Sequence, residues 1–277
     1  MGTCIWCRRP TLAEPVEHII PEGLIGEPTI RTSRPVRGVI ADRKLILRED
    51  EVCRRCNTRE LAPLDARLQD ALGILKVFLN SHGTKRGRAA RYERPGVYAE
   101  RRPRGPFIIL NAEQHTVTTE EGIAIQPVRK SEQVRLEDVS VSGSIVGMRV
   151  LHPFPLTKKI FRAIHKIAFE MLCFQEGPAF VLDPKFDHIR DYVLRGRGCR
   201  HLIVKAPGDP QSLTTPSITI ERIAGTVDRV VAVRLGLIFQ VDLTSDEHVF
   251  AGSDDELRQL GFVRIRDDHL GNRLPAR

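Results

Sequence analysis

Two Cys-x-x-Cys pairs constrain the fold of this chain more than any other feature of its sequence. Cys4 and Cys7 form the first pair, and Cys53 and Cys56 form the second. Each pair has the spacing of a zinc knuckle, and four thiolates fill the tetrahedral shell of a structural Zn²⁺ ion. We therefore expect a zinc ion to clamp the N-terminal part of the chain into a loop that is held at both ends.

The loop between the two pairs contains the string Glu17-His18-Ile19-Ile20-Pro21, and Asn57 directly follows the second pair. A clamp at both ends folds the loop back on itself, which brings Asn57 close to Glu17 and His18. An acid, a histidine and an amide beside basic residues indicate a site that cuts phosphodiester bonds. That reaction needs an activated water and relief of the phosphate charge, and a divalent cation can supply the charge relief.

Together, these residues resemble the HNH endonuclease family in its zinc-clamped ββα-metal form. The matching positions are the two cysteine pairs, the string from Glu17 to Pro21, and Asn57, and the resemblance covers roughly residues 1–65. It implies a strand, a second strand, the metal site and a helix in that order. It also implies a metal-dependent endonuclease that hydrolyses DNA, in a setting such as restriction or antiphage defence.

The resemblance implies a role for each residue of the site. His18 corresponds to the general base, and an imidazole with a pKa of about 6.5 suits that task at neutral pH. Glu17 stands where the family usually has an aspartate or histidine metal ligand, and Asn57 corresponds to the last ligand of the motif. These two residues would hold one Mg²⁺ or Mn²⁺ ion and leave most of its positions to water and DNA phosphate. In a regular strand His18 would point away from a metal on Glu17, so the site requires some local distortion.

Two positions depart from the family pattern. The middle asparagine of the family would fall near Arg48, but residues 40–52 contain no asparagine. Some members carry a second histidine one turn after the last ligand, where this chain has Leu61. The first departure affects the bracing of the loop, and the second favours a two-ligand magnesium site over catalytic zinc.

A zinc ribbon that binds nucleic acid without cutting it is the alternative. In that case Glu17 and His18 form a surface pair, and Asn57 caps a helix. Binding alone does not need an acid and a histidine beside an amide, which favours the enzyme. Basic residues around the second cysteine pair either contact phosphate or lie in solvent: Arg54, Arg55 and Arg59.

The charge of the chain favours a polyanionic partner, which we expect to be DNA. The 277 residues carry a formal net charge of +8, and 5% of them are aromatic, so phosphate contacts are expected rather than extensive base stacking. Basic residues crowd the stretch 82–106, which we interpret as a linker that is either solvated or in contact with phosphate. The nucleic-acid-binding residues expected in this linker are Lys85, Arg86 and Arg88.

The other two cysteines, Cys173 and Cys199, are expected to be buried free thiols, which fits a reducing compartment. No apolar run reaches the length of a membrane span, and the N-terminus lacks the pattern of a signal peptide. These features predict a cytoplasmic protein that makes no membrane contact.

The periodicity of apolar residues predicts an α+β fold in three parts. We expect an HNH-like module at 1–81, the basic linker at 82–106 and an α+β domain at 107–277. Strands are expected at 16–20, 44–47, 107–110, 116–118, 122–125, 201–205, 217–222, 228–242 and 247–251. Helices are expected at 57–61, 65–80, 159–174, 184–194 and 254–260, with Pro63 interrupting the first two.

The domain at 107–277 offers no catalytic motif, so its role is argued by analogy alone. Nucleases in restriction and defence often join a cleavage domain to a domain that recognises the target, which favours target recognition as the role of this domain. The alternative is regulation together with dimerisation, in which a second copy of the chain is the partner.

Overall fold

The computed structural model describes residues 2–12, 17–21, 46–47, 50–71, 90–94, 97–101, 107–111, 117–118, 124–125, 135–141, 144–151, 157–198, 200–205, 217–222, 229–235, 237–243, 253–259 and 262–267. The chain divides into two compact units. Unit 1 joins Met1–Asp70 to Leu156–Arg277, and unit 2 is Ala71–Pro155. Helices and antiparallel strand pairs both occur in the described residues, which makes the fold class α+β.

A five-stranded antiparallel sheet lies in the C-terminal part of unit 1, with the strand order β13-β14-β15-β12-β16. Residues Val231 and Val233 of the sheet are buried, whereas Ala232 between them is half-buried, as expected of a strand with one face on the core. The strands are β12 (His201–Lys205), β13 (Ser217–Arg222), β14 (Arg229–Leu235), β15 (Leu237–Asp242) and β16 (Phe262–Arg266).

Two of the predicted strands in this region, 201–205 and 217–222, are confirmed. The prediction of one strand at 228–242 was wrong, because β14 and β15 pair with each other as an antiparallel hairpin. Gly236 separates them in the sequence, and the antiparallel pairing of Leu235 with Leu237 divides the apolar run into two strands. The predicted strand at 247–251 lies outside the described residues.

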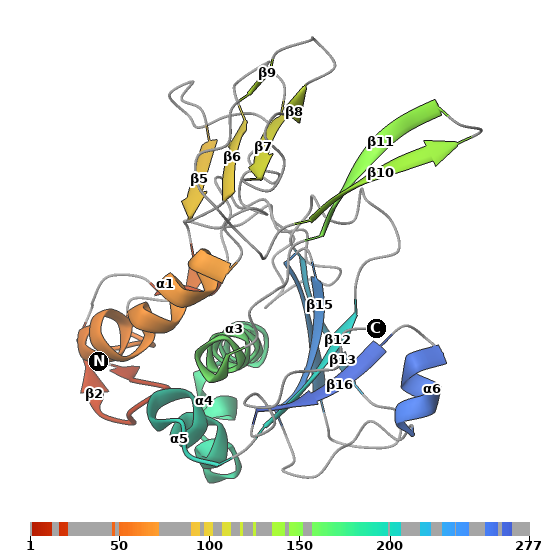
Figure 1. Cartoon of the computed structure of the whole chain (residues 1–277). Helices are drawn as coiled ribbons and strands as arrows, with labels where there is room; N and C mark the ends of the chain where they lie inside the picture. Colours follow the sequence, from red (N-terminus) through yellow and green to blue (C-terminus); the bar gives the residue numbers. More distant parts are fainter. Residues whose placement is uncertain are drawn as a thin grey trace. The chain divides into compact units, whose positions relative to one another are not determined.

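Helix α3, Lys158–Glu176, packs between this sheet and the N-terminal elements of unit 1 (Figure 1). The Thr157 side chain caps the helix by accepting a hydrogen bond from the Ile160 N–H at 3.4 Å. Gly177, with φ of 94°, ends it. The predicted helix at 159–174 is therefore confirmed. Buried residues run from Ile160 to Cys173 on nearly all sides of the helix, because other elements of unit 1 surround it.

Three short helical segments follow α3. Gly196 adopts a left-handed conformation with φ of 68° and ends the last of them. Arg162 of α3 donates hydrogen bonds to the carbonyl groups of Val193 and Leu194, which fixes this helix end against α3. The segments are α4 (Pro178–Val181), η2 (Pro184–Phe186) and α5 (Asp187–Arg195). The last two together confirm the helix predicted at 184–194.

The N-terminal part of unit 1 contains the expected order of two strands followed by a helix. The predicted helical stretch at 57–61 is a π-helix, η1, and Pro63 lies in the first turn of the α-helix that continues from it. The helical run continues through Pro63, which is the second residue of α1 directly after the π-helical turn, so the predicted interruption at Pro63 was wrong. Residues 72–80 of the predicted helix lie outside the described residues. The elements are β1 (Gly2–Thr3), β2 (Pro10–Thr11), β3 (Glu17–His18), β4 (Ile46–Leu47), η1 (Cys56–Leu61) and α1 (Ala62–Ala71).

Unit 2 consists of antiparallel strands in its described part. Two of them, β5 and β6, fall in the stretch 82–106, so this stretch is not loop throughout. Pro95-Gly96 lies between their sequences and is a turn signal, which the many arginines of the stretch obscure. The strands are β5 (Ala90–Arg94), β6 (Val97–Arg101), β7 (Phe107–Asn111), β8 (Val117–Thr118), β9 (Ala124–Ile125), β10 (Arg135–Val141) and β11 (Ser144–Leu151).

The two compact units have other boundaries than the three predicted parts. Residues 1–70 belong to the same unit as residues 156–277, since both contribute to the packing around α3.

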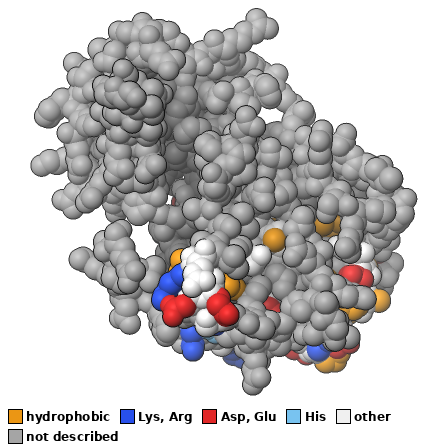
Figure 2. Space-filling view, turned by 90° about the vertical axis from the view of Figure 1, so that its right-hand side faces the viewer, with side chains coloured by type: hydrophobic (Ala, Val, Ile, Leu, Met, Phe, Trp, Pro, Cys, Tyr) orange, Lys and Arg blue, Asp and Glu red, His pale blue; other side chains and the backbone are white. Residues whose placement is uncertain are grey.

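The helix α6, Asp254–Gln259, confirms the prediction at 254–260. In the space-filling view, basic and acidic side chains lie next to each other on the described part of the visible face (Figure 2). On α6, Arg258 lies 3.0 Å from Asp255.

Candidate metal centre

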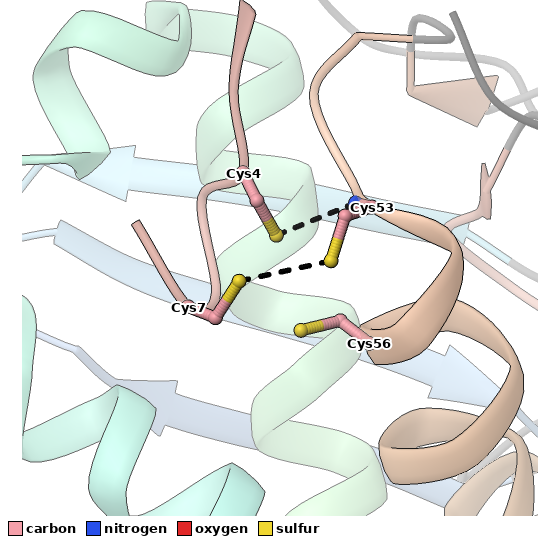
Figure 3. A group of neighbouring side chains, drawn as sticks. All are labelled: Cys4, Cys7, Cys53 and Cys56. Carbon is pink, nitrogen blue, oxygen red and sulfur yellow. Dashed lines mark hydrogen bonds between the residues drawn. The ribbon is translucent and has the colours of Figure 1, made fainter. Parts of the chain in front are cut away.

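The four cysteines of the two pairs come together in one cluster. The sulfur atoms of Cys4, Cys7, Cys53 and Cys56 all lie within 4.8 Å of one another. The side chains converge on a common centre from the N-terminal loop and from the turn that begins η1 (Figure 3). In a tetrahedral zinc tetrathiolate the sulfur atoms are about 3.8 Å apart, as follows from a Zn–S bond of about 2.3 Å. The donor set and its spacing therefore fit a zinc ion.

Backbone hydrogen bonds hold each pair in the turn that a knuckle requires. In the first pair, the Arg8 N–H donates to the Cys4 carbonyl and the Cys4 N–H donates to the Arg9 carbonyl, both at 2.9 Å. This closed turn places Arg8 in the left-handed region with φ of 59°, a conformation that is uncommon for a residue other than glycine. In the second pair, the Asn57 N–H donates to the Cys53 carbonyl at 3.0 Å.

The thiol groups influence one another because they are crowded. A hydrogen bond with Cys56 lowers the pKa of Cys4 to about 5, and the same bond raises the pKa of Cys56. Burial raises the pKa of Cys7 to about 11. Cys4 thus ionises easily, whereas Cys7 and Cys56 resist ionisation. A divalent cation would remove this resistance, because zinc binds cysteine as the thiolate.

A cluster of four charged side chains lies next to this centre and contains the predicted metal ligand Glu17. Lys166 of α3 is fully buried, and its Nζ lies 2.5 Å from Oε1 of Glu17. The same ammonium group lies 2.9 Å from both carboxylate oxygens of Asp65 in α1. Glu170, one turn further along α3, is 3.4 Å away. We call these four residues the lysine cluster.

The lysine cluster also connects to the first cysteine pair. The indole Nε1–H of Trp6 donates a hydrogen bond to Oε1 of Glu170 at 3.1 Å. The indole ring packs on Phe169 with a centroid distance of 4.8 Å. The Cys4–Cys7 turn, β3 and α1 are therefore all joined to one face of α3 through polar contacts that are shielded from water.

Burial and charge act against each other in this cluster. Burial raises the pKa of Glu17, of Asp65 and, most strongly, of Glu170, while the charge of Lys166 opposes each rise. Burial also opposes the charged form of Lys166, but the carboxylates of Glu170, Asp65 and Glu17 raise its pKa well above the usual value. The ammonium group is therefore the counter-charge that keeps the three acidic groups in the interior.

The structure places the residues of the expected catalytic site as follows. Glu17 and His18 form β3 and pair with Leu47 and Ile46 of β4. Glu17 is 3% exposed, whereas His18 is half-buried. Asn57 is half-buried in η1, and its carbonyl accepts a hydrogen bond from the Ala62 N–H.

The basic residues that were expected to bind nucleic acid fall into two groups. Arg54, Arg55 and Arg59 are exposed around the second cysteine pair. Arg55 lies 3.7 Å from Glu60, both of them on the surface. Three further predicted residues lie outside the described residues: Lys85, Arg86 and Arg88.

Sequence reasoning missed Lys166, Asp65 and Glu170. A signal was present, because Lys166 and Glu170 are four positions apart within the apolar run of the predicted helix 159–174. An opposite-charge pair inside a buried helical segment requires further partners in the interior. Cys173 is buried and not in a disulfide, as predicted, whereas Cys199 lies outside the described residues.

No known protein family, curated protein or solved structure matches this chain. Within the described residues, no helix combines the length and the apolar character that crossing a membrane requires.

Proposed function

We propose that this protein is a zinc-containing HNH-type endonuclease that hydrolyses phosphodiester bonds of DNA. The observation that supports the proposal is the cluster of four cysteines, which closes the loop from the first pair to the second. The loop then holds a strand pair with Glu17 and His18, and a helix that begins at the second pair and carries Asn57. These are the elements that the resemblance implies, in the same order.

In this proposal zinc is structural, and the chemistry belongs to the residues of β3 and η1. His18 takes a proton from the attacking water as general base. Glu17 and Asn57 would hold a Mg²⁺ or Mn²⁺ ion, which stabilises the charge on the phosphate. Glu17 also contacts Lys166. Lys166 has two other carboxylate partners, Asp65 and Glu170, so the ammonium group stays neutralised while Glu17 turns to a metal ion.

Replacing His18 with alanine tests the proposal. We expect the rate of plasmid cleavage with Mg²⁺ or Mn²⁺ to fall about 10²- to 10⁴-fold, because removal of a general base costs about that much. DNA binding and the melting temperature should stay close to those of the wild type. The matched control is His201→Ala, since His201 is also half-buried but belongs to β12. Full cleavage activity of His18→Ala would contradict the assignment of His18 as the general base of a nuclease site.

A zinc ribbon that binds nucleic acid without cutting it is the second candidate. The burial of Glu17 and its contact with Lys166 favour it, because a structural ion pair needs no metal ion. The Glu17→Gln variant distinguishes the two candidates. If the protein is a nuclease, this variant should need a higher concentration of Mg²⁺ for cleavage. If the protein is a zinc ribbon, no divalent ion should give cleavage; salt-dependent DNA binding is expected in both cases.

A further inference from the structure

A pocket of about 650 Å³ opens beside the cysteine cluster. This volume suits a ligand of nucleotide size. The described lining residues come from three segments: Trp6, Cys7, Arg8, Arg9 and Pro10 from the first cysteine pair and the turn after it; Cys53, Arg55, Cys56 and Glu60 from the second; and Asp187, Arg190, Asp191, Leu194 and Arg195 from α5 and its start. We call it the arginine pocket.

Every basic residue among the described lining residues is an arginine. The five arginines face three carboxylates, which leaves a surplus of two positive charges. The guanidinium group presents a planar fork of N–H donors that matches the oxygens of a phosphate, and it stays charged at all physiological pH values. A pocket with this composition favours a phosphate over a neutral or cationic ligand.

Two of the arginines build the wall of the pocket. Arg190 is buried and donates from Nε to the Ile5 carbonyl at 2.7 Å, and its other donors engage Asp187 and the Val181 carbonyl. Arg8 also contacts Asp187, at 3.0 Å, and donates to the Leu182 carbonyl at 2.8 Å. These contacts join the first cysteine pair to α5 and use the donors that a ligand would need.

The other three arginines are exposed and are the candidates for ligand contact. Arg55 lies 3.7 Å from Glu60, and Arg195 pairs with Asp191 one turn earlier on α5. Exposed ion pairs of this kind contribute little net stability because water solvates both partners. A phosphate can therefore replace the carboxylate beside either arginine. Arg9 is exposed and lines the pocket from the turn after the first cysteine pair.

We propose that the arginine pocket binds one phosphate group, held by Arg9, Arg55 and Arg195. Three cysteines line the same pocket, and zinc-bound thiolates would offset the surplus positive charge, so the guanidinium forks of the exposed arginines, rather than the summed charge, select a phosphate group. We assign the phosphate to a nucleic-acid strand, and this choice of source rests on the proposed function.

Binding of oligonucleotides to the full-length, zinc-loaded protein tests this proposal. The probe is a fluorescent single strand with a 5′-phosphate, compared with the same strand with a 5′-hydroxyl group, and no Mg²⁺ or Mn²⁺ is added. We expect Arg9→Gln, Arg55→Gln and Arg195→Gln each to weaken binding about threefold to tenfold. The matched control is Arg258→Gln, which should not change it. The side chains of Arg258 and Arg55 are both 64% exposed and both lie near an acidic partner, but Arg258 belongs to α6.

A second pair of variants has the opposite expected sign. Asp191→Asn and Glu60→Gln remove the carboxylates that compete for Arg195 and Arg55, so each should tighten binding about twofold to fivefold. Arginines that only stabilise the fold would give no such gain, because both acidic residues are partners in the free protein.

Competition with inorganic phosphate and with adenosine monophosphate identifies the source of the phosphate. Displacement of the probe at micromolar concentrations assigns the pocket to a free phosphate compound, and a lack of displacement assigns it to the strand. The proposal is overturned if the three arginine variants bind like Arg258→Gln, or if the two acidic variants show no gain. If cleavage depends on His18 but these binding effects are absent, only the proposal of a phosphate-binding pocket is contradicted. If these binding effects are present but the protein cuts no DNA, only the proposal of nuclease activity is contradicted.

Discussion

Replacing Cys53 with serine is expected to release zinc and to unfold the N-terminal part of unit 1. Structural zinc sites contribute about 10–16 kcal/mol of binding free energy in small zinc peptides, and that energy is coupled to folding. A whole domain is stable by only about 5–15 kcal/mol. The strands of this part are two residues long and cannot persist without the clamp. The loss of zinc-binding free energy should therefore exceed the free energy of unfolding of this part of the chain.

The effect of Cys53→Ser should extend beyond the cysteine turns. Ile5 and Trp6 are buried beside Cys4, and Trp6 contacts Phe169 of α3. Opening the turn would expose these side chains and one face of α3 to water. We expect a loss of zinc by elemental analysis together with a lower melting temperature for unit 1.

The control for this prediction is Cys173→Ala, which removes a buried thiol that does not belong to the cluster. It should keep its zinc and lose about 1–3 kcal/mol at most, as expected of a small cavity. A Cys53→Ser protein that lacks zinc and still melts like the wild type would contradict a structural role for the metal.

Several elements could be predicted because their signals are local. The spacing of the four cysteines predicted their cluster, since a pair of thiols two residues apart already has the geometry of half a zinc site. The helix at 159–174 and the strands at 201–205 and 217–222 follow from the spacing of apolar residues over a few turns or pleats. Each signal lies within a short window of the sequence, so no knowledge of distant contacts was needed.

The lysine cluster and the composition of unit 1 could not be predicted in the same way. Lys166 lies 149 positions from Glu17 and 101 from Asp65. Neither the charge of these residues nor their spacing identifies their partners. The apolar face of α3 predicted burial, but not which element would cover it. Glu17 was accordingly expected beside a metal ion, whereas the structure places an ammonium group next to it.

Replacing Lys166 with methionine is expected to destabilise the protein by about 3–5 kcal/mol, the usual loss when one partner of a buried ion pair is removed. Methionine keeps most of the volume, so the loss reports on charge rather than on a cavity. Glu17, Asp65 and Glu170 would remain in the interior without a counter-charge. The measurement is urea unfolding, and the matched control is Lys159→Met, because Lys159 is exposed on the first turn of the same helix.

A chain that ends at residue 106 should be even less stable than the Lys166→Met variant. It keeps the four cysteines, Glu17 and Asp65, but it lacks Lys166 and the surface of α3 that covers Trp6. We expect this short chain to bind zinc without acquiring a stable fold. A short chain that unfolds cooperatively in urea would show that residues 1–106 form a domain of their own.

The pH dependence of Lys166→Met separates lost charge from lost packing. In the wild type, the charge of Lys166 opposes the rise in pKa that burial causes in Glu17, Asp65 and Glu170. Without it these pKa values rise further above their unfolded values. Stability of the variant is then present at low pH, where the carboxyl groups are protonated in both states, and is lost as the pH rises through the folded pKa values. The difference in unfolding free energy between wild type and Lys166→Met should therefore be smaller at pH 5 than at pH 8. A difference that stays constant over this range would mean that Lys166 stabilises the fold through packing rather than as a counter-charge.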